Sequence, residues 1–141
     1  MSLINLKIVS PEKKVFEQGG FYSVTLPTES GEITVLPGHI PLISKVVPGE
    51  IIARNEKGEE SLITLNGFLK LDHAGNILIL SDYAIRSEDV EIERVQEAKK
   101  KAEETLKEKG SDRDFIVAEA ELKKTLLELK VAQRRKSKVR V

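Results

Sequence analysis

The side chains able to support acid–base or metal chemistry are few in this 141-residue chain. Only two histidines occur, His39 and His73, and neither has a neighbour at a metal-ligand spacing such as HxxxH. Cysteine is absent, which removes disulfides, thiolate nucleophiles and cysteine-based metal sites. No GxxxxGK, GxGxxG or GxSxG motif is present. We therefore predict no catalytic residue, no metal site and no enzymatic activity for the chain acting alone.

The two histidines lie in segments typical of turns. His73 is in "DHAGN", which predicts an exposed loop. His39 is in "LPGHIPLIS", between Pro37 and Pro41 and directly after Gly38. Because proline fixes φ and glycine permits a sharp turn, this segment should be stiff. A histidine bonded to the backbone of such a turn is favoured over a catalytic one.

Composition and charge exclude several classes of partner. The 23 basic and 23 acidic residues cancel, so no net field attracts nucleic acid or a membrane surface. The basic tail "RRKSKVRV" has no interleaved aromatic residues for base stacking, which disfavours a nucleic-acid adaptor. Neither a signal peptide nor a run of about 20 apolar residues is evident, so we expect a cytoplasmic protein.

Short alternating runs predict that residues 1–86 form a β domain. In "INLKIV", the side chains of Ile4, Leu6 and Ile8 share one face. Turn signals such as "QGG", "ESG" and "VPGE" separate the later runs. These runs are "FYSVTLP", "EITVLP", "LISKVV", "EIIARN", "SLITL", "FLKL" and "NILILS". Many short strands at near-regular spacing are typical of an antiparallel β-sandwich or a flattened barrel.

The hydrophobic period becomes helical in residues 87–141. Ser87 is the expected N-cap of a first helix that ends at Gly110, and a second helix should begin after Ser111 or Asp112. The first apolar stripe is Val95, Ala98, Ala102 and Leu106. The second is Phe115, Ala118, Leu122, Leu126 and Leu129. The short link predicts an antiparallel hairpin, and its alanine-rich seam buries little apolar area, so the hairpin should open readily.

The same segments resemble a known family over nearly the whole chain. They are "VSPEKKVF", "GEITVLPGHIPLIS", "LNGFLKL", "AIRSEDV" and "AEAELKKTLLELKVA", in that order. The sequence resembles the ε subunit of bacterial rotary F-type ATP synthases. The resemblance implies a β-sandwich that binds the rotating γ subunit and the proton-translocating ring of c subunits, and a mobile helical hairpin that inhibits ATP hydrolysis in the catalytic α/β head. It also implies a peripheral location on the cytoplasmic face of the bacterial cell membrane, with membrane contact only through the complex.

The resemblance further implies contact residues on the sandwich. The segment "PTESGEITVLPGH" matches the part of the family that faces the c-ring, so the candidates for ring contact are Glu29, Gly31, Glu32 and His39. Looser candidates for the γ face are Ser10 and Leu42. A rigid turn would then act as a coupling surface, because a fixed contact transmits torque better than a mobile one. The alternative is that the turn only joins two strands, and we favour docking.

On the hairpin, the resemblance implies an inhibitory contact and a degraded nucleotide site. The inhibitory candidates are Arg134, Arg135 and Lys136. The positions that match ATP-binding members are Val90, Glu91, Arg94, Lys124 and Glu128. Lys124 and Glu128 replace two arginines, and a carboxylate repels polyphosphate, so we expect weak or absent ATP binding and no cofactor. The alternatives are an ATP-sensing hairpin protein, or a solvated ion pair of Arg94 with Glu91 or Glu97.

Overall fold

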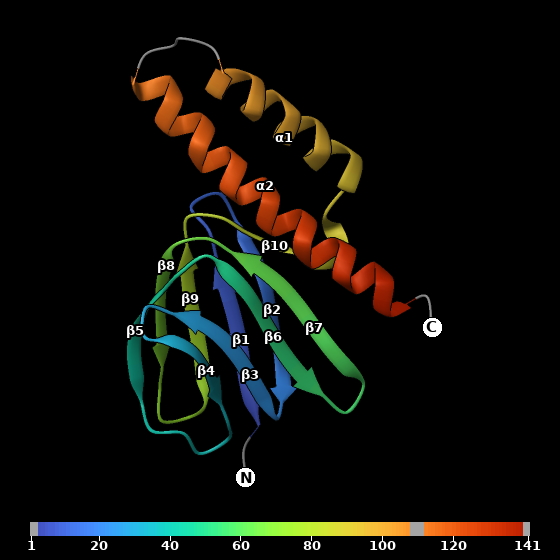
Figure 1. Ribbon diagram of the computed structural model, residues 1–141. Coiled ribbons are helices and arrows are strands. Elements are labelled where there is room, and N and C mark those ends of the chain that lie inside the picture. Colours follow the sequence, from blue (N-terminus) through green and yellow to red (C-terminus); the bar gives the residue numbers. More distant parts are fainter. Residues whose placement is uncertain (1–2, 108–111, 140–141) are drawn as a thin grey trace. The chain divides into compact units, whose positions relative to one another are not determined.

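Ten strands of the first part of the chain form one sheet that folds over on itself (Figure 1). The computed structural model describes residues 3–107 and 112–139, with side chains through Arg135. The strands are β1 (Ile4–Val9), β2 (Lys14–Phe21), β3 (Ser23–Thr28), β4 (Gly31–Val35), β5 (Leu42–Val46), β6 (Gly49–Asn55), β7 (Gly58–Thr64), β8 (Gly67–Leu71), β9 (Asn76–Ser81) and β10 (Ala84–Arg86). Their order is β10-β7-β6-β3-β5-β8-β9-β1-β2, with β4 paired to β3. Because β2 contacts β6 and β10 near the other end of this order, the sheet closes around a core.

The core of the sandwich is mainly aliphatic, in a chain of which aromatic residues make up only 4%. Ile4, Leu6 and Ile8 are each at most 1% exposed, which confirms the face assigned to β1. The aromatic members of the core cluster are Phe16 and Phe21 on β2, whose ring centroids lie 6.2 Å apart. The core residues of β1 were therefore predicted correctly from the sequence, but the neighbouring strand β2 was not predicted.

Strands β2 and β10 are absent from the sequence prediction, and the assignment of "QGG" to a turn was wrong. Gly19 and Gly20 lie inside β2, where the register against β1 shifts. Gly20 has φ of 86°, and a Cβ on Gly19 would lie 2.2 Å from Asn5 Oδ1. Glycine here permits a bulge and a close approach between strands, so the residues that resemble a turn instead bend an edge strand.

The second part of the chain contains a short 3₁₀ turn, η1 (Ser87–Asp89), followed by α1 (Ile92–Lys107) and α2 (Asp112–Val139). The two helices run antiparallel and contact each other, which confirms the predicted hairpin (Figure 1). The predicted start of the first helix at Ser87 was wrong. Val90 N–H donates to Ser87 O at 3.3 Å and closes the 3₁₀ turn, whereas the first α-helical bond runs from Val95 N–H to Glu91 O at 3.0 Å.

The predicted apolar stripe of α2 is partly wrong. Phe115 and Leu126 are 50% and 45% exposed. Ala118 and Leu129 of the predicted stripe are buried, and Thr125 and Ala132 are also buried on this face. These positions recur at intervals of seven, four and three residues, and Phe115 and Leu126 fall at the edge of the face they define. Thr125 is tolerated in this face because its hydroxyl donates to the Leu122 carbonyl at 2.9 Å.

Candidate functional site

A cleft of about 640 Å³ opens on the sandwich where strands β5, β8 and β9 meet neighbouring loops. We call it the edge cleft, and the lining residues used below are Val9, Ser10, Glu29, Lys45, Gly67, Phe68 and Leu80. Gly67 in its lining lies against the backbone of β9, because a Cβ there would lie 2.1 Å from the Leu80 carbonyl oxygen. Only glycine therefore allows β8 and β9 to approach this closely.

One row of the sheet supplies an exposed apolar surface beside the edge cleft. Lys45 pairs with Phe68, Phe68 with Leu80, and Leu80 with Val9, so the four positions cross four strands in register. Phe68 is 56% exposed and Leu80 is 51% exposed. Ile43, in the adjacent row, is 75% exposed. Neighbouring exposed apolar side chains on a sheet face are typical of a protein-binding surface.

Ile43, Phe68 and Leu80 are not among the candidates predicted from the sequence, although the strand patterns indicate them. In "FLKL" and "NILILS", apolar residues occupy both faces of a strand rather than alternating with polar ones. A strand of an antiparallel sheet that is apolar on both faces favours a second covered surface. An antiparallel strand is usually assumed to expose one face to solvent, and under that assumption the apolar residues on the outer face of these strands are not recognised as a binding surface.

Two of the predicted contact residues meet in the edge cleft. Ser10 and Glu29 both line it, although 18 residues separate them and the resemblance assigned them to different partners. Ser10 Oγ donates to the Lys13 carbonyl at 3.2 Å within its own turn. Leu42 is half-buried and packs against the core cluster. The structure thus unites part of the predicted ring and γ candidates on one surface.

Gly31 and Glu32 lie on the hairpin between β3 and β4. Gly31 has φ of 108°, a conformation that favours glycine, and its carbonyl accepts a hydrogen bond of 2.6 Å from Thr28 Oγ1. Glu32 is exposed on β4 and pairs with Pro27 in register. Glu29 N–H also donates to the Lys45 carbonyl at 3.4 Å, which connects this hairpin to β5.

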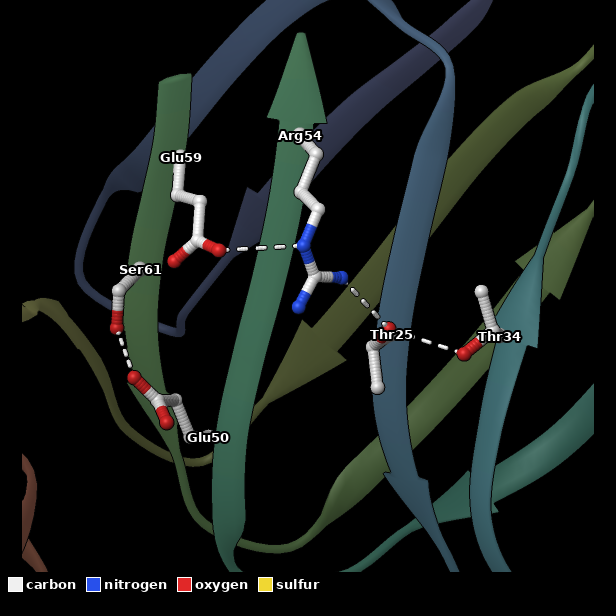
Figure 2. Close-up of polar contacts among 6 residues, drawn as sticks. All are labelled: Thr25, Thr34, Glu50, Arg54, Glu59 and Ser61. Atoms are coloured by element: carbon white, nitrogen blue, oxygen red, sulfur yellow. Dashed lines mark hydrogen bonds and ion pairs between the residues drawn. The ribbon is translucent and has the colours of Figure 1, made fainter.

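A polar network braces the same hairpin from the β6 and β7 side, as Figure 2 shows. The hydroxyls of Thr25 on β3 and Thr34 on β4 lie 3.0 Å apart. Arg54 on β6 donates to Thr25 Oγ1 at 3.3 Å and, from Nε, to Glu59 Oε1 at 3.2 Å. Ser61 Oγ donates to a Glu50 carboxylate oxygen in the same view. The Thr25–Thr34 contact joins β3 to β4, which pairs only with β3 among the described strands, and the Arg54 bonds connect β3 to β6 and β7.

The "LPGH" segment forms a tight turn that accounts for its residue types. His39 N–H donates to the Leu36 carbonyl at 3.1 Å, and Gly38 has φ of 85°. Proline followed by glycine with positive φ is the requirement of a type II turn. The His39 ring donates from Nδ1 to the Ile40 carbonyl at 2.7 Å, because a carbonyl only accepts. The expected backbone-bonded histidine is therefore present, and its side chain is exposed.

The two histidines line one hollow of about 190 Å³, a proximity that the sequence did not predict. Within residues 3–107 and 112–139, no group of three or more histidine, cysteine, aspartate or glutamate side chains could hold a metal ion. In the residue before His73, the Asp72 carboxylate accepts hydrogen bonds of 2.9 Å from the N–H groups of both Ala74 and Asn76. The bonds from Asn76 are the main reason that the pKa of Asp72 is below its ordinary value.

The predicted nucleotide positions are not arranged as a cluster of free cations. Val90 and Glu91 precede α1 rather than lying within it. Arg94 is exposed and lies 3.7 Å from the Glu91 carboxylate, as the ion-pair alternative predicts. Lys124 lies 4.0 Å from Glu121, and Glu128 is only 4% exposed.

The inhibitory candidates lie near the end of α2. Arg134 is exposed and Arg135 is half-buried. The side chain of Lys136 lies outside the described residues. In the described part of the chain, no helix is both long and apolar enough to cross a membrane.

Family models match both parts of the chain. The model of the ATP synthase Delta/Epsilon chain, beta-sandwich domain, matches residues 3–87. The model of the ATP synthase Delta/Epsilon chain, long alpha-helix domain, matches residues 88–133. The ATP synthase epsilon chains of Bordetella avium and Bordetella parapertussis are 41% and 40% identical over 123 residues. Each alignment covers 86% of this chain and 86% of the relative.

Two solved structures share the fold at low sequence identity. The Euglena gracilis mitochondrial ATP synthase, OSCP/F1/c-ring in rotational state 1, contains a chain with a TM-score of 0.64 and 18% identity. The match covers 99% of this chain and 82% of that one. The Tetrahymena thermophila mitochondrial ATP synthase central stalk/c-ring contains a chain with a TM-score of 0.54 and 13% identity. This match covers 92% of the present chain and 96% of the Tetrahymena chain.

Proposed function

Because this chain belongs to the ATP synthase delta/epsilon family, we propose that it is a non-catalytic subunit of the central stalk of a proton-translocating ATP synthase. Its sandwich would bind the γ subunit and the c-ring, and would couple ring rotation to the catalytic head. The complex would place it peripherally on the cytoplasmic face of the membrane. The names of its relatives and the central-stalk contexts of its structural neighbours support this assignment.

The observation that carries the proposal is the exposed row of Lys45, Phe68 and Leu80 beside the edge cleft. Leaving such side chains in water is unfavourable, and covering them releases about 25 cal/mol per Å² of apolar area. We assign this row and the edge cleft to the γ subunit, with Ser10 on the rim and Leu42 supporting the surface from the core. Glu29 would lie where the γ contact approaches the ring contact.

We assign the c-ring contact to the β3–β4 hairpin and the "LPGH" turn, with Gly31, Glu32 and His39 as contact residues. Both elements are stiff, since a Thr28 hydrogen bond and a type II turn fix their backbones. A stiff contact suits the transfer of torque, because little work is lost in deforming it. These assignments give the sandwich two functional surfaces.

The hairpin would regulate hydrolysis. Small residues, Ala98, Ala102 and Ala118, lie along its seam, so separation of the helices exposes little apolar area per residue. Two arrangements of such a hairpin can differ by only a few kcal/mol, which is the condition for a switch. Arg134, Arg135 and Lys136 would meet acidic surfaces of the head. We expect ATP binding at Arg94 to be weak, because its Glu91 partner competes with phosphate.

The experiment is reconstitution with an ATP synthase head that contains γ but has been depleted of its own copy of this subunit. The full chain should co-elute with the head and lower its ATP hydrolysis rate in a saturable way. A chain ending at Arg86 should co-elute without lowering the rate. Failure of the full chain to co-elute would refute the stalk assignment, whereas equal rates with the two forms would refute only the inhibitory role.

A further inference from the structure

Positive charge is concentrated on one face of the sandwich, although the formal charges of the whole chain cancel. Strands β5, β8, β9 and β1 are neighbours in the sheet, and together they contain three lysines but no aspartate or glutamate. The lysines are Lys7, Lys45 and Lys70, and all three are exposed. Their ammonium groups form no ion pair with a carboxylate of residues 3–107 or 112–139. A face of this kind attracts a partner of negative charge.

The lysines lie among apolar side chains that point to the same side of the sheet. Lys70 pairs with Ile43 on β5 and with Leu78 on β9, and Leu78 pairs in turn with Lys7. This row runs beside a second one, which is made of Lys45, Phe68, Leu80 and Val9. We call the two rows together the lysine face. Because neighbouring strands are about 4.8 Å apart, the Cα atoms of Lys70 and Lys7 are separated by about 10 Å, and their fields add at moderate salt.

The carboxylates at the margins of the lysine face have partners of their own. Glu17 on β2 pairs with Lys7 in register, but its carboxylate lies 2.7 Å from Lys14 Nζ. Lys14 is accordingly the main reason that the pKa of Glu17 is below its ordinary value, and Lys7 contributes less. Asp72 follows β8 and accepts two backbone N–H bonds within its own turn. The lysine face therefore contains no anion that neutralises its centre.

Lys70 is the lysine whose position is most informative about a partner. A lysine at the rim of an interface can extend its ammonium group into water while its apolar stem is covered. Lys70 instead lies between Ile43 and Leu78 in its row and follows the exposed Phe68 by two residues along β8. A partner that covers these apolar side chains also covers Lys70, and an ammonium group taken out of water needs an anion beside it.

We propose that the part of γ that covers the lysine face is an acidic amphipathic segment. Its apolar side chains lie on Phe68 and Leu80, and its carboxylates face the three lysines, one of them opposite Lys70. The inference rests on the proposed function and adds the chemistry of the partner to it. The charges raise the rate of association over a distance, whereas the carboxylate bound to Lys70 also slows dissociation.

The first test replaces Lys70 with methionine and measures Kd for a γ-containing head that lacks its own copy of the subunit. Methionine keeps an unbranched apolar stem and removes the charge. If the partner is acidic, Lys70→Met leaves a covered carboxylate unpaired, and Kd should rise about ten-fold or more. If the partner is merely apolar, the same substitution should lower Kd, so an unchanged or lower Kd overturns the proposal. Lys57→Met is the matched control, because Lys57 is exposed in the turn between β6 and β7, and its Kd should equal that of the wild type.

The second test follows association with the same head by stopped flow as the NaCl concentration is raised. Between about 0.05 and 0.5 M NaCl, the wild-type rate constant should fall about ten-fold, and that of a variant with all three lysines changed to glutamine should fall less than about two-fold. Equal salt dependence of the two proteins would contradict the proposal. So would wild-type binding of this variant to the head together with loss of its binding to phosphatidylglycerol vesicles, which would assign the lysine face to a lipid surface.

The two levels of the argument fail in different ways. If the wild-type chain does not associate with the head at all, the stalk assignment is refuted and this inference with it. If the wild-type chain associates and Lys70→Met binds equally well, only the acidic character of the partner is refuted. Urea unfolding of each variant verifies that the sandwich is intact.

Discussion

Replacing Phe68 with alanine should weaken binding to γ without destabilising the sandwich. Phe68 is 56% exposed, and a phenylalanine presents about 200 Å² in total, so about 110 Å² is available to a partner. At about 25 cal/mol per Å², covering this area contributes nearly 3 kcal/mol, of which the alanine retains a part. We expect a loss of about 2 kcal/mol, or about a 30-fold increase in Kd. The free energy of unfolding should change by only about 0.5 kcal/mol, because the side chain is outside the core.

The assay is a calorimetric titration of the Phe68→Ala chain into a γ-containing head that lacks its own copy of the subunit. Tyr22→Ala is the matched control, because Tyr22 is a 46% exposed aromatic residue of the same domain and does not line the edge cleft. Urea unfolding of both variants checks that the sandwich is intact. Wild-type affinity of Phe68→Ala, or an equal loss in Tyr22→Ala, would refute the assignment of the γ surface to this row.

Three other predictions concern the hairpin between β3 and β4, the edge cleft and a turn. Glu32→Lys should weaken association with the c-ring while leaving the unfolding curve unchanged, and unaltered assembly and coupling would argue against the ring assignment. Gly67→Ala should destabilise the chain by about 1–3 kcal/mol in urea, because the added Cβ meets the backbone of Leu80, and an unchanged midpoint would show that the strands can separate. Because the pKa of Asp72 is lowered in the folded chain, its carboxylate stabilises the fold at pH values above the ordinary aspartate pKa, and this stabilisation is lost as the pH falls through the lowered pKa. Asp72→Asn should therefore lose less stability in acid than the wild type does. Equal pH profiles of the free energy of unfolding would exclude the Asn76 bonds as a source of stability.

The alternating pattern of β1 was sufficient to predict its buried face, and the change of period near Ser87 was sufficient to predict the passage from strands to helices. Local patterns failed where tertiary contacts decide the outcome. Gly19 and Gly20 resemble a turn because a bulge and a turn require the same backbone freedom. Phe115 fits a helical stripe by spacing, but the seam with α1 selects a face centred on Ala118.

Much of the candidate site was beyond sequence reasoning for a similar reason. Ser10, Glu29 and Phe68 come together only because β5, β8, β9 and β1 are neighbours in the folded sheet. Spacing along the chain contains no information on that neighbourhood, and only the resemblance selected Ser10 and Glu29. The "LPGH" turn was readable, because Pro37 and Gly38 impose local geometry whatever surrounds them.

The pairing of β1 with β9 has a consequence for synthesis of the chain. The two strands are parallel, and the side chains that meet at one end, Asn5 and Asn76, are 71 residues apart. At roughly 5–20 residues per second, β1 waits on the order of 4–14 s before its partner leaves the ribosome. Until then its apolar face has no complete core to enter, and such distant pairing also slows folding. The helices α1 and α2, whose mutual contacts are local in sequence, are synthesised after all ten strands of the sandwich.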